Sequence, residues 1–366
     1  MTAAKEETYL FRFNKKYQDL FRDIIKINGF KNGYRTFWMK TLYNQHRMAR
    51  RREKSADEGL RVPPVLIYSI TNRCNLQCKG CYAHSQKRVV NNELSVHRMG
   101  KVIDEASELG IGVVMIAGGE PLMRSEILHI ASNHKEIIFP IFTNGVLLDE
   151  TRLNFFRENK HLIPVLSLEG NREMTDNRRG QGLFEVIKKR TGELNKRNQF
   201  YGLSITLTSN NFESVVSHDM MKEFNKRGCK LFFLVEYVPT SEADEDLCLT
   251  PEQKSVLADR LKRLRKEIPA LFISLPGDEE QYGGCLAAGR AFVHLSSDGQ
   301  LEPCPFAPYS DVDLNYMTLK EALDSDFLEW IRNNHQNLSE SKGGCTLWEN
   351  REWVEKQLQK SYSISA

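Results

Sequence analysis

The sequence lacks two features that would place the protein in or beyond a membrane. No apolar run approaches the ~20 residues that a bilayer-spanning helix needs. The first residues, MTAAKEETYLFRF, contain no continuous apolar segment typical of a secretory signal. We therefore expect a cytoplasmic protein, in which the eight cysteines stay reduced rather than form disulfides.

Other absences narrow the class of protein. The sequence has no long internal repeat, no low-complexity stretch, no phosphate-binding glycine loop and no defensible Ser-His-Asp arrangement, and its nine histidines show no metal-ligand spacing. The 366 residues are 40% hydrophobic and 27% charged, as in a soluble globular protein with two domains or one large domain and an appendage. Clustered cysteines in such a chain indicate metal binding or redox chemistry.

Basic residues are concentrated near the N-terminus. Residues 1–54 contain 14 Lys and Arg against 5 Asp and Glu, a net charge of +9, which leaves −6 for the rest of the chain. Apolar side chains recur at helical spacing within residues 8–60 and predict basic helices. We favour a helical cap packed on the body of the protein. A peripheral contact of residues 8–54 with an anionic inner-membrane surface is the alternative, and nucleic-acid binding is disfavoured because no recognised fold accompanies the charge.

After Pro63-Pro64 the pattern changes to alternating strands and helices. The six expected strands are Val65–Ile70, Val113–Ala117, Glu136–Phe142, Ile163–Leu168, Tyr201–Leu207 and Lys230–Val238. The expected helices between them are Leu94–Leu109, Ser125–His134, Glu150–Asn159, Gly182–Arg197 and Phe212–Arg227. This repetition predicts an α/β fold with a parallel sheet, a partial (β/α)6 TIM-like barrel that is two units short of closure.

We divide the chain into four parts. A basic helical extension (residues 1–61) precedes the partial barrel (residues 62–240), which an acidic connector (residues 241–280) joins to a small C-terminal α+β domain (residues 281–366). The connector contains a predicted helix, and the C-terminal domain a hairpin and further helices. These elements are expected at Pro251–Lys266, at Phe292–Cys304 with its turn at 297–299, and near 318–334 and 349–361.

Cys74, Cys78 and Cys81 form a C-x3-C-x2-C cluster directly after the first strand. Ligands of open parallel sheets bind at the carboxyl ends of strands, so the cluster lies where a cofactor is expected. Three thiolates can hold an iron–sulfur cluster, which needs four anchors for full ligation, and the remaining iron stays open for chemistry. A structural zinc site with a distant fourth cysteine and three buried thiols are the alternatives.

Three motifs, in order along residues 62–240, together resemble the radical S-adenosylmethionine (SAM) enzymes. The cysteine triplet resembles the family's cluster-binding signature, and Gly118-Gly119-Glu120-Pro121 resembles its GGE motif, whose backbone meets the SAM amino group. Ser167-Leu168-Glu169-Gly170 resembles the position that contacts the ribose and carboxylate. Many relatives have Asp where this chain has Glu169.

The resemblance implies a 4Fe-4S cluster on the three thiolates, with SAM chelated by the open iron. It also implies an electron donor such as flavodoxin or ferredoxin, cleavage of SAM to a 5'-deoxyadenosyl radical, and hydrogen abstraction from a substrate C–H bond. The candidate SAM-binding residues are Tyr82, Gly118, Gly119, Glu120, Thr143, Asn144, Ser167, Glu169 and Arg178. Simple turns at the glycines and at Thr143-Asn144, and solvated Arg178 and Arg179 side chains, are the alternative interpretations.

Cys285, Cys304 and Cys345 form a second triplet beyond the barrel. Their spacing resembles the SPASM/twitch class of C-terminal extensions, in which an auxiliary 4Fe-4S cluster is bound. Three cysteines fit the shorter twitch form better than the seven-cysteine SPASM form. The fourth ligand is left open between Cys248, a side chain other than cysteine, water and substrate, whereas we expect Cys229 to belong to the core. Zinc or core packing are the alternatives for this triplet.

Glu236-Tyr237 ends the sixth strand and is the candidate catalytic pair. A carboxylate and a phenol at the barrel mouth could move a proton after hydrogen abstraction. Contact with the SAM adenine or simple strand capping is the competing interpretation.

The sequence therefore predicts a radical SAM enzyme, an oxidoreductase or a radical-mediated transferase or lyase. We expect an oxidation, dehydrogenation or rearrangement assisted by the auxiliary cluster, on a substrate that the sequence does not identify. The alternatives are a maturase of a peptide or protein, a lipid-modifying enzyme docked on the membrane by its basic helices, and a metal-binding scaffold without activity.

Overall fold

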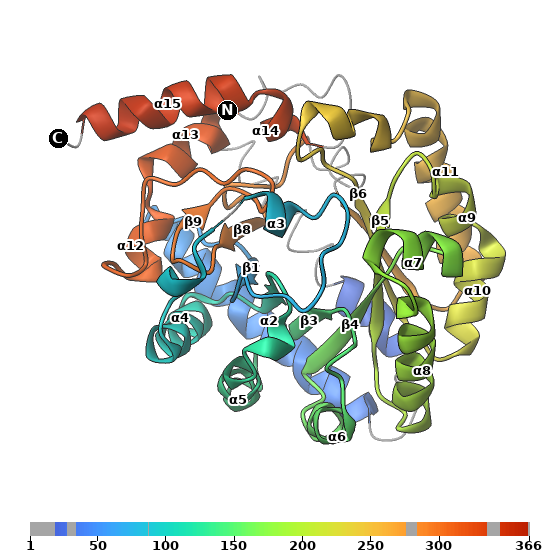
Figure 1. Cartoon of the computed structure of the whole chain (residues 1–366). Coiled ribbons are helices and arrows are strands. Elements are labelled where there is room, and N and C mark those ends of the chain that lie inside the picture. The colour runs from blue at the N-terminus through green and yellow to red at the C-terminus, as the bar shows by residue number, and fades with distance from the viewer. Residues whose placement is uncertain (1–18, 28–33, 87, 276–283, 335–344, 365–366) are drawn as a thin grey trace.

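The computed structural model describes residues 19–27, 34–86, 88–275, 284–334 and 345–364 (Figure 1). The predicted basic extension therefore lies partly outside the described residues, at 1–18 and 28–33. Residues 276–283, shortly before Cys285, and residues 335–344, directly before Cys345, lie outside them as well.

The described residues form one curled sheet of nine strands, in the order β7-β6-β5-β4-β3-β2-β1-β8-β9. All neighbouring strands are parallel except β8 and β9, which form an antiparallel pair. The strands are β1 (Val65–Ser69), β2 (Val113–Ala117), β3 (Phe139–Thr143), β4 (Leu162–Leu168), β5 (Gly202–Leu207), β6 (Leu231–Glu236), β7 (Leu271–Leu275), β8 (Phe292–Leu295) and β9 (Leu301–Glu302). This confirms the expected α/β partial barrel.

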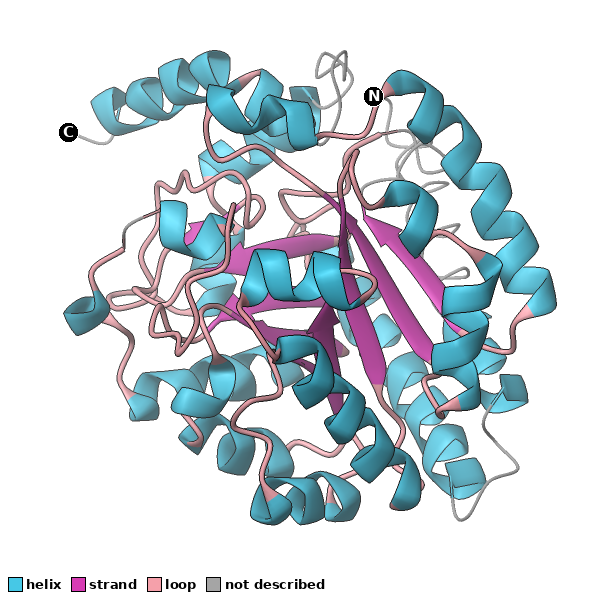
Figure 2. Cartoon of the chain, turned by 45° about the vertical axis from the view of Figure 1, so that its right-hand side comes forward, coloured by secondary structure: helices cyan, strands magenta, loops and turns pink. Residues whose placement is uncertain are grey.

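Helices cover the outer face of the sheet, and those of the C-terminal part gather beside β8 and β9 (Figures 1 and 2). The α-helices are α2 (Tyr34–Asp57), α3 (Tyr82–Ser85), α4 (Val96–Leu109), α5 (Glu126–Asn133), α6 (Glu150–Glu158), α7 (Arg172–Arg179), α8 (Leu183–Lys196), α9 (Phe212–Val215), α10 (His218–Lys226), α11 (Pro251–Glu267), α12 (Leu319–Leu323), α13 (Asp326–Asn334), α14 (Thr346–Glu349) and α15 (Arg351–Ile364). Short 3-10 helices are η1 (Val90–Asn92), η2 (Pro121–Met123) and η3 (Glu242–Leu247).

Local sequence signals explain where several helices begin and end. Ser95 caps α4 by accepting a hydrogen bond from the backbone N–H of Arg98 (3.2 Å), and Gly110 ends the helix with a φ of +92°. Thr250 caps α11 in a reciprocal capping box with Gln253. These signals lie in the sequence itself, which is why the helices were predictable.

Helix α2 packs across the amino-terminal ends of the strands and closes that end of the barrel. Trp38 is fully buried, and its ring lies 5.0 Å from that of Phe200, just before β5. Gln45 Nε2 donates to the Gly112 carbonyl (2.8 Å) and Arg52 Nη1 to the Gly110 carbonyl (2.6 Å), both at the start of β2. Over residues 34–57, helix α2 thus packs on the barrel as the favoured cap interpretation expects.

Three elements differ from the sequence-based expectations. The predicted helix Phe212–Arg227 is two helices, because Ser217 caps a new one by accepting from the Met220 N–H (3.3 Å). The third strand begins at Phe139 rather than Glu136, since a turn bonded from Ile137 N to His134 O (3.1 Å) precedes it. The sheet is also longer than six strands: β7 comes from the connector, and β8 pairs with β1.

Candidate functional site

The loop that contains Cys74, Cys78 and Cys81 connects β1 to α3 at the carboxyl edge of the sheet. All three cysteines are half-buried and free. Two backbone hydrogen bonds join the start of this loop to the turn after β2, from Gly119 N to Thr71 O (2.7 Å) and from Glu120 N to Arg73 O (2.8 Å). The GGE turn therefore holds the cysteine loop in place.

Gly118 and Gly119 permit this close approach. A Cβ atom at Gly119 would lie 2.1 Å from the Arg73 carbonyl oxygen, and one at Gly118 would lie 2.4 Å from that of Thr71. Gly118 also has a φ of +123°, a conformation that other residues rarely adopt. The two glycines thus form a tight turn, as one interpretation expects. Both also line the cavity described below, so contact with a ligand is compatible with the turn.

The Glu120 carboxylate is buried and connects the ends of β2 and β3. It accepts hydrogen bonds from the Thr143 hydroxyl (2.7 Å) and from the backbone N–H of Asn144 (2.8 Å) and Leu122 (3.1 Å). Burial raises its pKa, and these donors oppose that rise. Asn144 Nδ2 donates in turn to Asn75 Oδ1 in the cysteine loop (2.8 Å). The Thr143-Asn144 turn is therefore a support of the loop.

Glu169, after β4, pairs with two arginines of α7. Its Oε1 lies 2.5 Å from Nη1 of Arg178 and 2.5 Å from Nη2 of Arg179. Arg178 Nη1 also bonds the Thr206 hydroxyl (2.9 Å), and its Nε donates to the Lys79 carbonyl (3.2 Å) between the cysteines. Both arginine side chains are largely buried, at 19% and 13% exposure, so the solvated interpretation of them is wrong.

The second triplet assembles from three segments of the C-terminal part. Cys285 and Cys304 are brought together by a backbone hydrogen bond from Ala288 N to Pro303 O (3.1 Å). Cys345 lies at the start of α14. The pKa of the Cys304 thiol is raised well above its ordinary range, first by a hydrogen bond with Cys345 and then by burial, and Cys285 contributes further. The three thiols are therefore neighbours.

Both triplets line the same cavity, whose volume is about 280 Å³. Apolar side chains come from the first three strands and from β6 to β8, whereas hydroxyls come from β4 and β5. The apolar lining includes Ile67, Met115, Phe142, Val235, Leu275 and Phe292. The polar lining includes Ser167, Ser204, Thr206, Arg178, Arg179, Glu236 and Tyr237. Reactive groups at the strand ends thus face a largely apolar interior.

Most predicted site residues lie on this cavity. Those on its wall are Cys74, Cys78, Cys81, Tyr82, Gly118, Gly119, Glu120, Asn144, Ser167, Arg178, Glu236, Tyr237, Cys285, Cys304 and Cys345. Thr143 and Glu169 do not line it but bond residues that do. Sequence reasoning missed Ser204 and Thr206, although their alternation along β5 places both on one face of the sheet.

Glu236 and Tyr237 lie at the end of β6. Glu236 is only 4% exposed, and its Oε2 lies 4.0 Å from the Lys254 ammonium of α11. The Tyr237 hydroxyl abuts the cysteine loop so closely that a Cβ on Gly80 would lie 2.6 Å from it. Burial raises the pKa of Tyr237. This geometry places a carboxylate and a phenol beside the first triplet.

Tyr82 connects the two triplets. It follows Cys81 directly, and its ring makes an edge contact with Phe306, two residues after Cys304, at a centroid distance of 5.3 Å. Burial raises the pKa of its phenol. The candidate SAM contact is therefore also a contact between the barrel and the C-terminal part.

The two remaining cysteines lie elsewhere. Cys229 is fully buried in the core, as expected, and burial raises its pKa to about 12. Cys248 does not line the cavity; its thiol donates to the Tyr237 carbonyl at 3.8 Å. Cys248 thus lies beside the end of β6, outside the cavity wall.

The cavity suits an iron–sulfur cluster and SAM. No three His, Cys, Asp or Glu side chains of the described residues converge on a single metal ion, but the three thiols around one cavity are the ligand type of a cluster with several irons. Burial raises the pKa of the Cys74 and Cys78 thiols, so they stay protonated until iron displaces the protons. Glu169 Oε2, behind the Arg178 and Arg179 side chains that line the cavity, is buried without a hydrogen-bond partner among the described residues.

Comparison with known proteins assigns the class. Residues 68–221 match the family model of the Radical SAM superfamily, and this range contains the cysteine loop, the GGE turn and the end of β4. Residues 68–221 of the chain thus carry a radical SAM domain. Members of the family use a 4Fe-4S cluster together with SAM.

Two similar proteins come from Methanosarcina barkeri. An Fe-coproporphyrin III synthase is 28% identical over 211 residues, which cover 56% of this chain and 53% of that protein, so the match spans about half of the relative. An AdoMet-dependent heme synthase is 26% identical over 316 residues, 78% of this chain and 88% of that protein.

A solved structure shares the fold over most of the chain. Streptococcus suis SuiB, crystallised with its precursor peptide SuiA, superposes with a TM-score of 0.59 at 18% identity, covering 82% of this chain and 71% of SuiB.

Among the described residues, no helix is both long and apolar enough to span a bilayer.

Proposed function

We propose that this protein reductively cleaves SAM and abstracts hydrogen from a substrate C–H bond, in an oxidation, dehydrogenation or rearrangement assisted by an auxiliary cluster. The single observation that carries the proposal is that both cysteine triplets and the GGE turn open onto one cavity. Cys74, Cys78 and Cys81 would hold the 4Fe-4S cluster at which SAM binds. The cluster and SAM, when bound, supply the 5'-deoxyadenosyl radical.

The chain's own residues divide the cavity into two parts. Ser167, Ser204 and Thr206 present hydroxyls from β4 and β5, next to the Arg178 guanidinium, and this polar part would hold SAM. The rest of the wall, which includes the cysteines, Glu236 and Tyr237, is mainly apolar and would hold the target C–H bond. Apolar walls exclude water from a reactive intermediate and offer few competing reactions. The arrangement supports radical chemistry on an unactivated carbon.

Glu236 and Tyr237 are the proposed groups for proton movement. Both line the cavity, at the end of β6 and therefore beside the first triplet. The Lys254 ammonium lies 4.0 Å from Glu236 Oε2, and an ionised carboxylate at this position could accept a proton from an oxidised substrate. A role in SAM contact would instead lower 5'-deoxyadenosine formation in variants of either residue, whereas a role in proton movement would lower product formation alone.

Cys285, Cys304 and Cys345 would hold the auxiliary cluster. Because these cysteines line the same cavity as the first triplet, their position supports a role near the substrate rather than at a remote structural site. Because Cys248 does not line this wall, the proposal is that the fourth ligand is not Cys248. Water, substrate or a side chain other than cysteine then completes the site.

Two classes of substrate are suggested by similar proteins, tetrapyrroles and peptides. The first is supported by the names of the two Methanosarcina relatives, and the second by the fold shared with SuiB. The same cavity of about 280 Å³ would also hold the clusters and SAM, so its volume favours neither class.

Hydrogen abstraction is tested with anaerobically reconstituted protein, SAM, a strong reductant, and either iron-coproporphyrin III or the SuiA peptide as a probe. An accepted substrate class should accelerate the formation of 5'-deoxyadenosine, and a deuterated form of that probe should pass deuterium into it. An iron-replete protein that neither binds SAM in equilibrium dialysis nor forms 5'-deoxyadenosine would overturn the proposal.

A membrane contact is proposed separately, through the outer face of α2. This face exposes Met39 (57%) and Tyr43 (62%) among basic side chains, and the Arg47 guanidinium lies 6.0 Å from the Tyr43 ring centroid. The helix covers the amino-terminal ends of the strands, whereas the cavity opens at their carboxyl ends. Docking by α2 would direct the cavity away from the bilayer, which argues against the lipid-modifying alternative.

A scaffold without activity would instead be colourless and zinc-loaded.

A further inference from the structure

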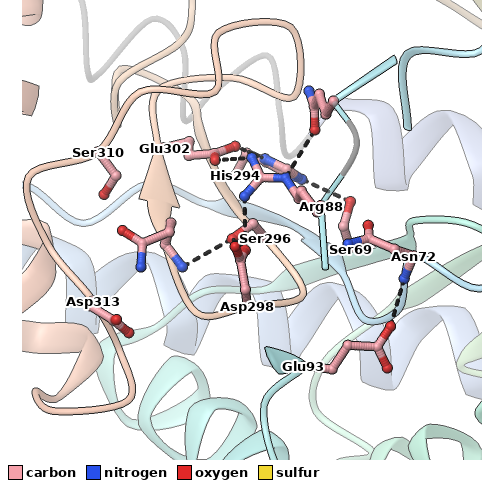
Figure 3. A network of polar contacts seen from close by, with 12 residues as sticks. Ser69, Asn72, Arg88, Glu93, His294, Ser296, Asp298, Glu302, Ser310 and Asp313 are labelled. Atoms are coloured by element: carbon pink, nitrogen blue, oxygen red, sulfur yellow. Dashed lines mark hydrogen bonds and ion pairs between the residues drawn. The ribbon is translucent and has the colours of Figure 1, made fainter. Parts of the chain in front are cut away.

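A buried chain of polar side chains joins β1 of the barrel to the β8–β9 hairpin (Figure 3). Ser69 Oγ lies 2.8 Å from Nε2 of His294, and Nδ1 of His294 lies 2.7 Å from Oε2 of Glu302. His294 and Glu302 are each 1% exposed and Ser69 is 6% exposed. Polar groups buried this deeply are retained only when each has a partner.

The partners fix the direction of these hydrogen bonds. A carboxylate is only an acceptor, so the Nδ1–H of His294 donates to Glu302. In the neutral imidazole Nε2 then accepts from the Ser69 hydroxyl. Both ring nitrogens are therefore used, one toward each strand. Few other side chains could make the same two bonds in the same volume.

Arg88 extends the chain toward the first cysteine loop. Its guanidinium pairs with Glu302 and, through Nη1, with Asp298 Oδ1 at 2.8 Å in the hairpin turn. Gln86 Nε2 donates to the Pro305 carbonyl (2.7 Å), and Leu94 N donates to the Ser297 carbonyl (2.7 Å). The described residues of segment 86–94, here named the bridging segment, are thus bonded along the hairpin that contains Cys304.

The bridging segment also holds the start of the first cysteine loop. Glu93 Oε1 accepts from the backbone N–H of Asn72 and from the Thr71 hydroxyl, both at 2.8 Å. Asn72 lies two residues before Cys74, and Glu302 lies two residues before Cys304. One connected set of polar contacts therefore holds both cysteine-bearing loops, in each case next to a cysteine.

We propose that His294 is a positioning residue that locks the Cys304 loop to β1 and so fixes the second triplet relative to the first. This inference rests on the proposed function, in which the two triplets hold two clusters. The parallel backbone ladder between β8 and β1 holds the hairpin in the sheet, but backbone hydrogen bonds alone are also compatible with a shifted register. Directional bonds between Ser69, His294 and Glu302 supply that selection.

A second interdomain network provides a matched control. Arg98 of α4 donates to the carbonyls of Leu314 (2.6 Å) and Met317 (2.7 Å), and to Glu105 (2.7 Å). It joins the barrel to the C-terminal part as the His294 network does, but it contacts no residue that flanks a cysteine. Loss of Arg98 should therefore loosen the C-terminal part in general without acting on Cys304.

The experiment compares wild type with His294→Gln, Ser69→Ala and the control Arg98→Ala, each reconstituted anaerobically. Ser69→Ala removes a single oxygen and is the variant least expected to disturb folding. Loss of a side chain that is hydrogen-bonded to a metal ligand typically weakens metal affinity by roughly 10- to 100-fold. His294 and Ser69 act on the Cys304 loop through Glu302 and not on a ligand atom, so we expect a smaller loss, up to roughly 10-fold, at the second triplet in both network variants. Chelator competition and the electron paramagnetic resonance signal of that cluster measure it.

His294→Gln should leave the first cluster's signal and substrate-free SAM cleavage unchanged, whereas Ser69→Ala also removes a hydrogen bond to Tyr82, next to Cys81. Arg98→Ala should lower Tm without weakening the second cluster. The positioning role is refuted if both network variants keep the wild-type chelator resistance, or if Arg98→Ala loses it equally. The rate of amide hydrogen exchange in residues 300–307 does not measure metal content. It should rise more in the two network variants than in Arg98→Ala.

Failure of the proposed function gives a different result. Wild type would then contain the same iron as a Cys285→Ala/Cys304→Ala/Cys345→Ala variant, so that no second cluster exists. The hydrogen-exchange comparison would still decide whether His294 locks the hairpin. Unchanged exchange in both network variants would reject the lock whatever the metal content.

Discussion

Nη1 of Arg178 lies 2.5 Å from Oε1 of Glu169, while Nε of the same guanidinium donates to the Lys79 carbonyl inside the cysteine loop. One arginine of α7 thus ties the end of β4 to the loop that would hold a cluster. Arg179 adds a second bond to the same carboxylate oxygen. The two arginines are therefore held in place before any ligand arrives.

Glu169→Gln should destabilise the fold strongly. Removal of one partner of a buried ion pair leaves uncompensated charge, at a cost of about 3–5 kcal/mol in free energy of unfolding. The control is Glu185→Gln, because Glu185 pairs with Arg172 at the surface, where the side chains are 48% and 59% exposed. That change should cost less than about 1 kcal/mol. Equal urea midpoints for the two variants would contradict the buried pairing.

Gly119→Ala should displace the cysteine loop, since its Cβ would lie 2.1 Å from the Arg73 carbonyl oxygen. Overpacking of this kind costs about 1–3 kcal/mol, and the shifted loop should also lose iron. Gly192→Ala in α8 is the matched control, because no atom lies within 4 Å of its Cβ position. It should stabilise the helix by about 0.5–1 kcal/mol. Iron content and thermal unfolding of both variants check the prediction.

The pH dependence of stability should depend on Cys229, whose pKa burial raises to about 12. Cysteine in the unfolded chain ionises near pH 8.5, so the stabilisation is complete below that pH and is lost as the pH rises toward 12. At pH 10 wild type should have lost about 2 kcal/mol that Cys229→Ala does not lose. Urea unfolding of both proteins at pH 7 and pH 10 measures this difference. Equal losses would mean that the thiol is not buried.

Vesicle binding tests the outer face of α2. Full-length protein should co-sediment with phosphatidylserine-containing vesicles at low salt but not with phosphatidylcholine vesicles, and 0.5 M salt should abolish the binding. Each basic residue near an anionic surface contributes about 1 kcal/mol, so Arg47→Glu/Arg50→Glu should weaken binding at least tenfold. Binding to neither type of vesicle would remove the membrane proposal and leave α2 as a cap.

Local patterns predicted the barrel and the first triplet, because strand alternation, caps and the C-x3-C-x2-C spacing all lie within short segments. Helix α7 was not predicted, since its sequence REMTDNRR has almost no apolar side chain and is started by the Asn171 cap. The pairing of Glu169 with Arg178 and Arg179 was missed with it. A polar helix of this kind is held by its charges rather than by an apolar stripe.

Long-range pairing explains what else the sequence did not reveal. That the second triplet shares a cavity with the first follows from β8 pairing with β1, more than two hundred residues apart in the chain. The partners of His294 come from β1 and β9, and no local pattern marks them as neighbours. The assignment of roles to Glu236, Tyr237 and the second triplet stays a prediction.

The central claim is tested most directly by 5'-deoxyadenosine formation from SAM under strong reductant. Wild type is compared with a Cys74→Ala/Cys78→Ala/Cys81→Ala variant and a Cys285→Ala/Cys304→Ala/Cys345→Ala variant, with iron measured in each. The account predicts 5'-deoxyadenosine from wild type and from the variant that lacks the second triplet, and none from the variant that lacks the first triplet. Product from the first variant, or none from an iron-replete wild type that also fails to bind SAM, would contradict it.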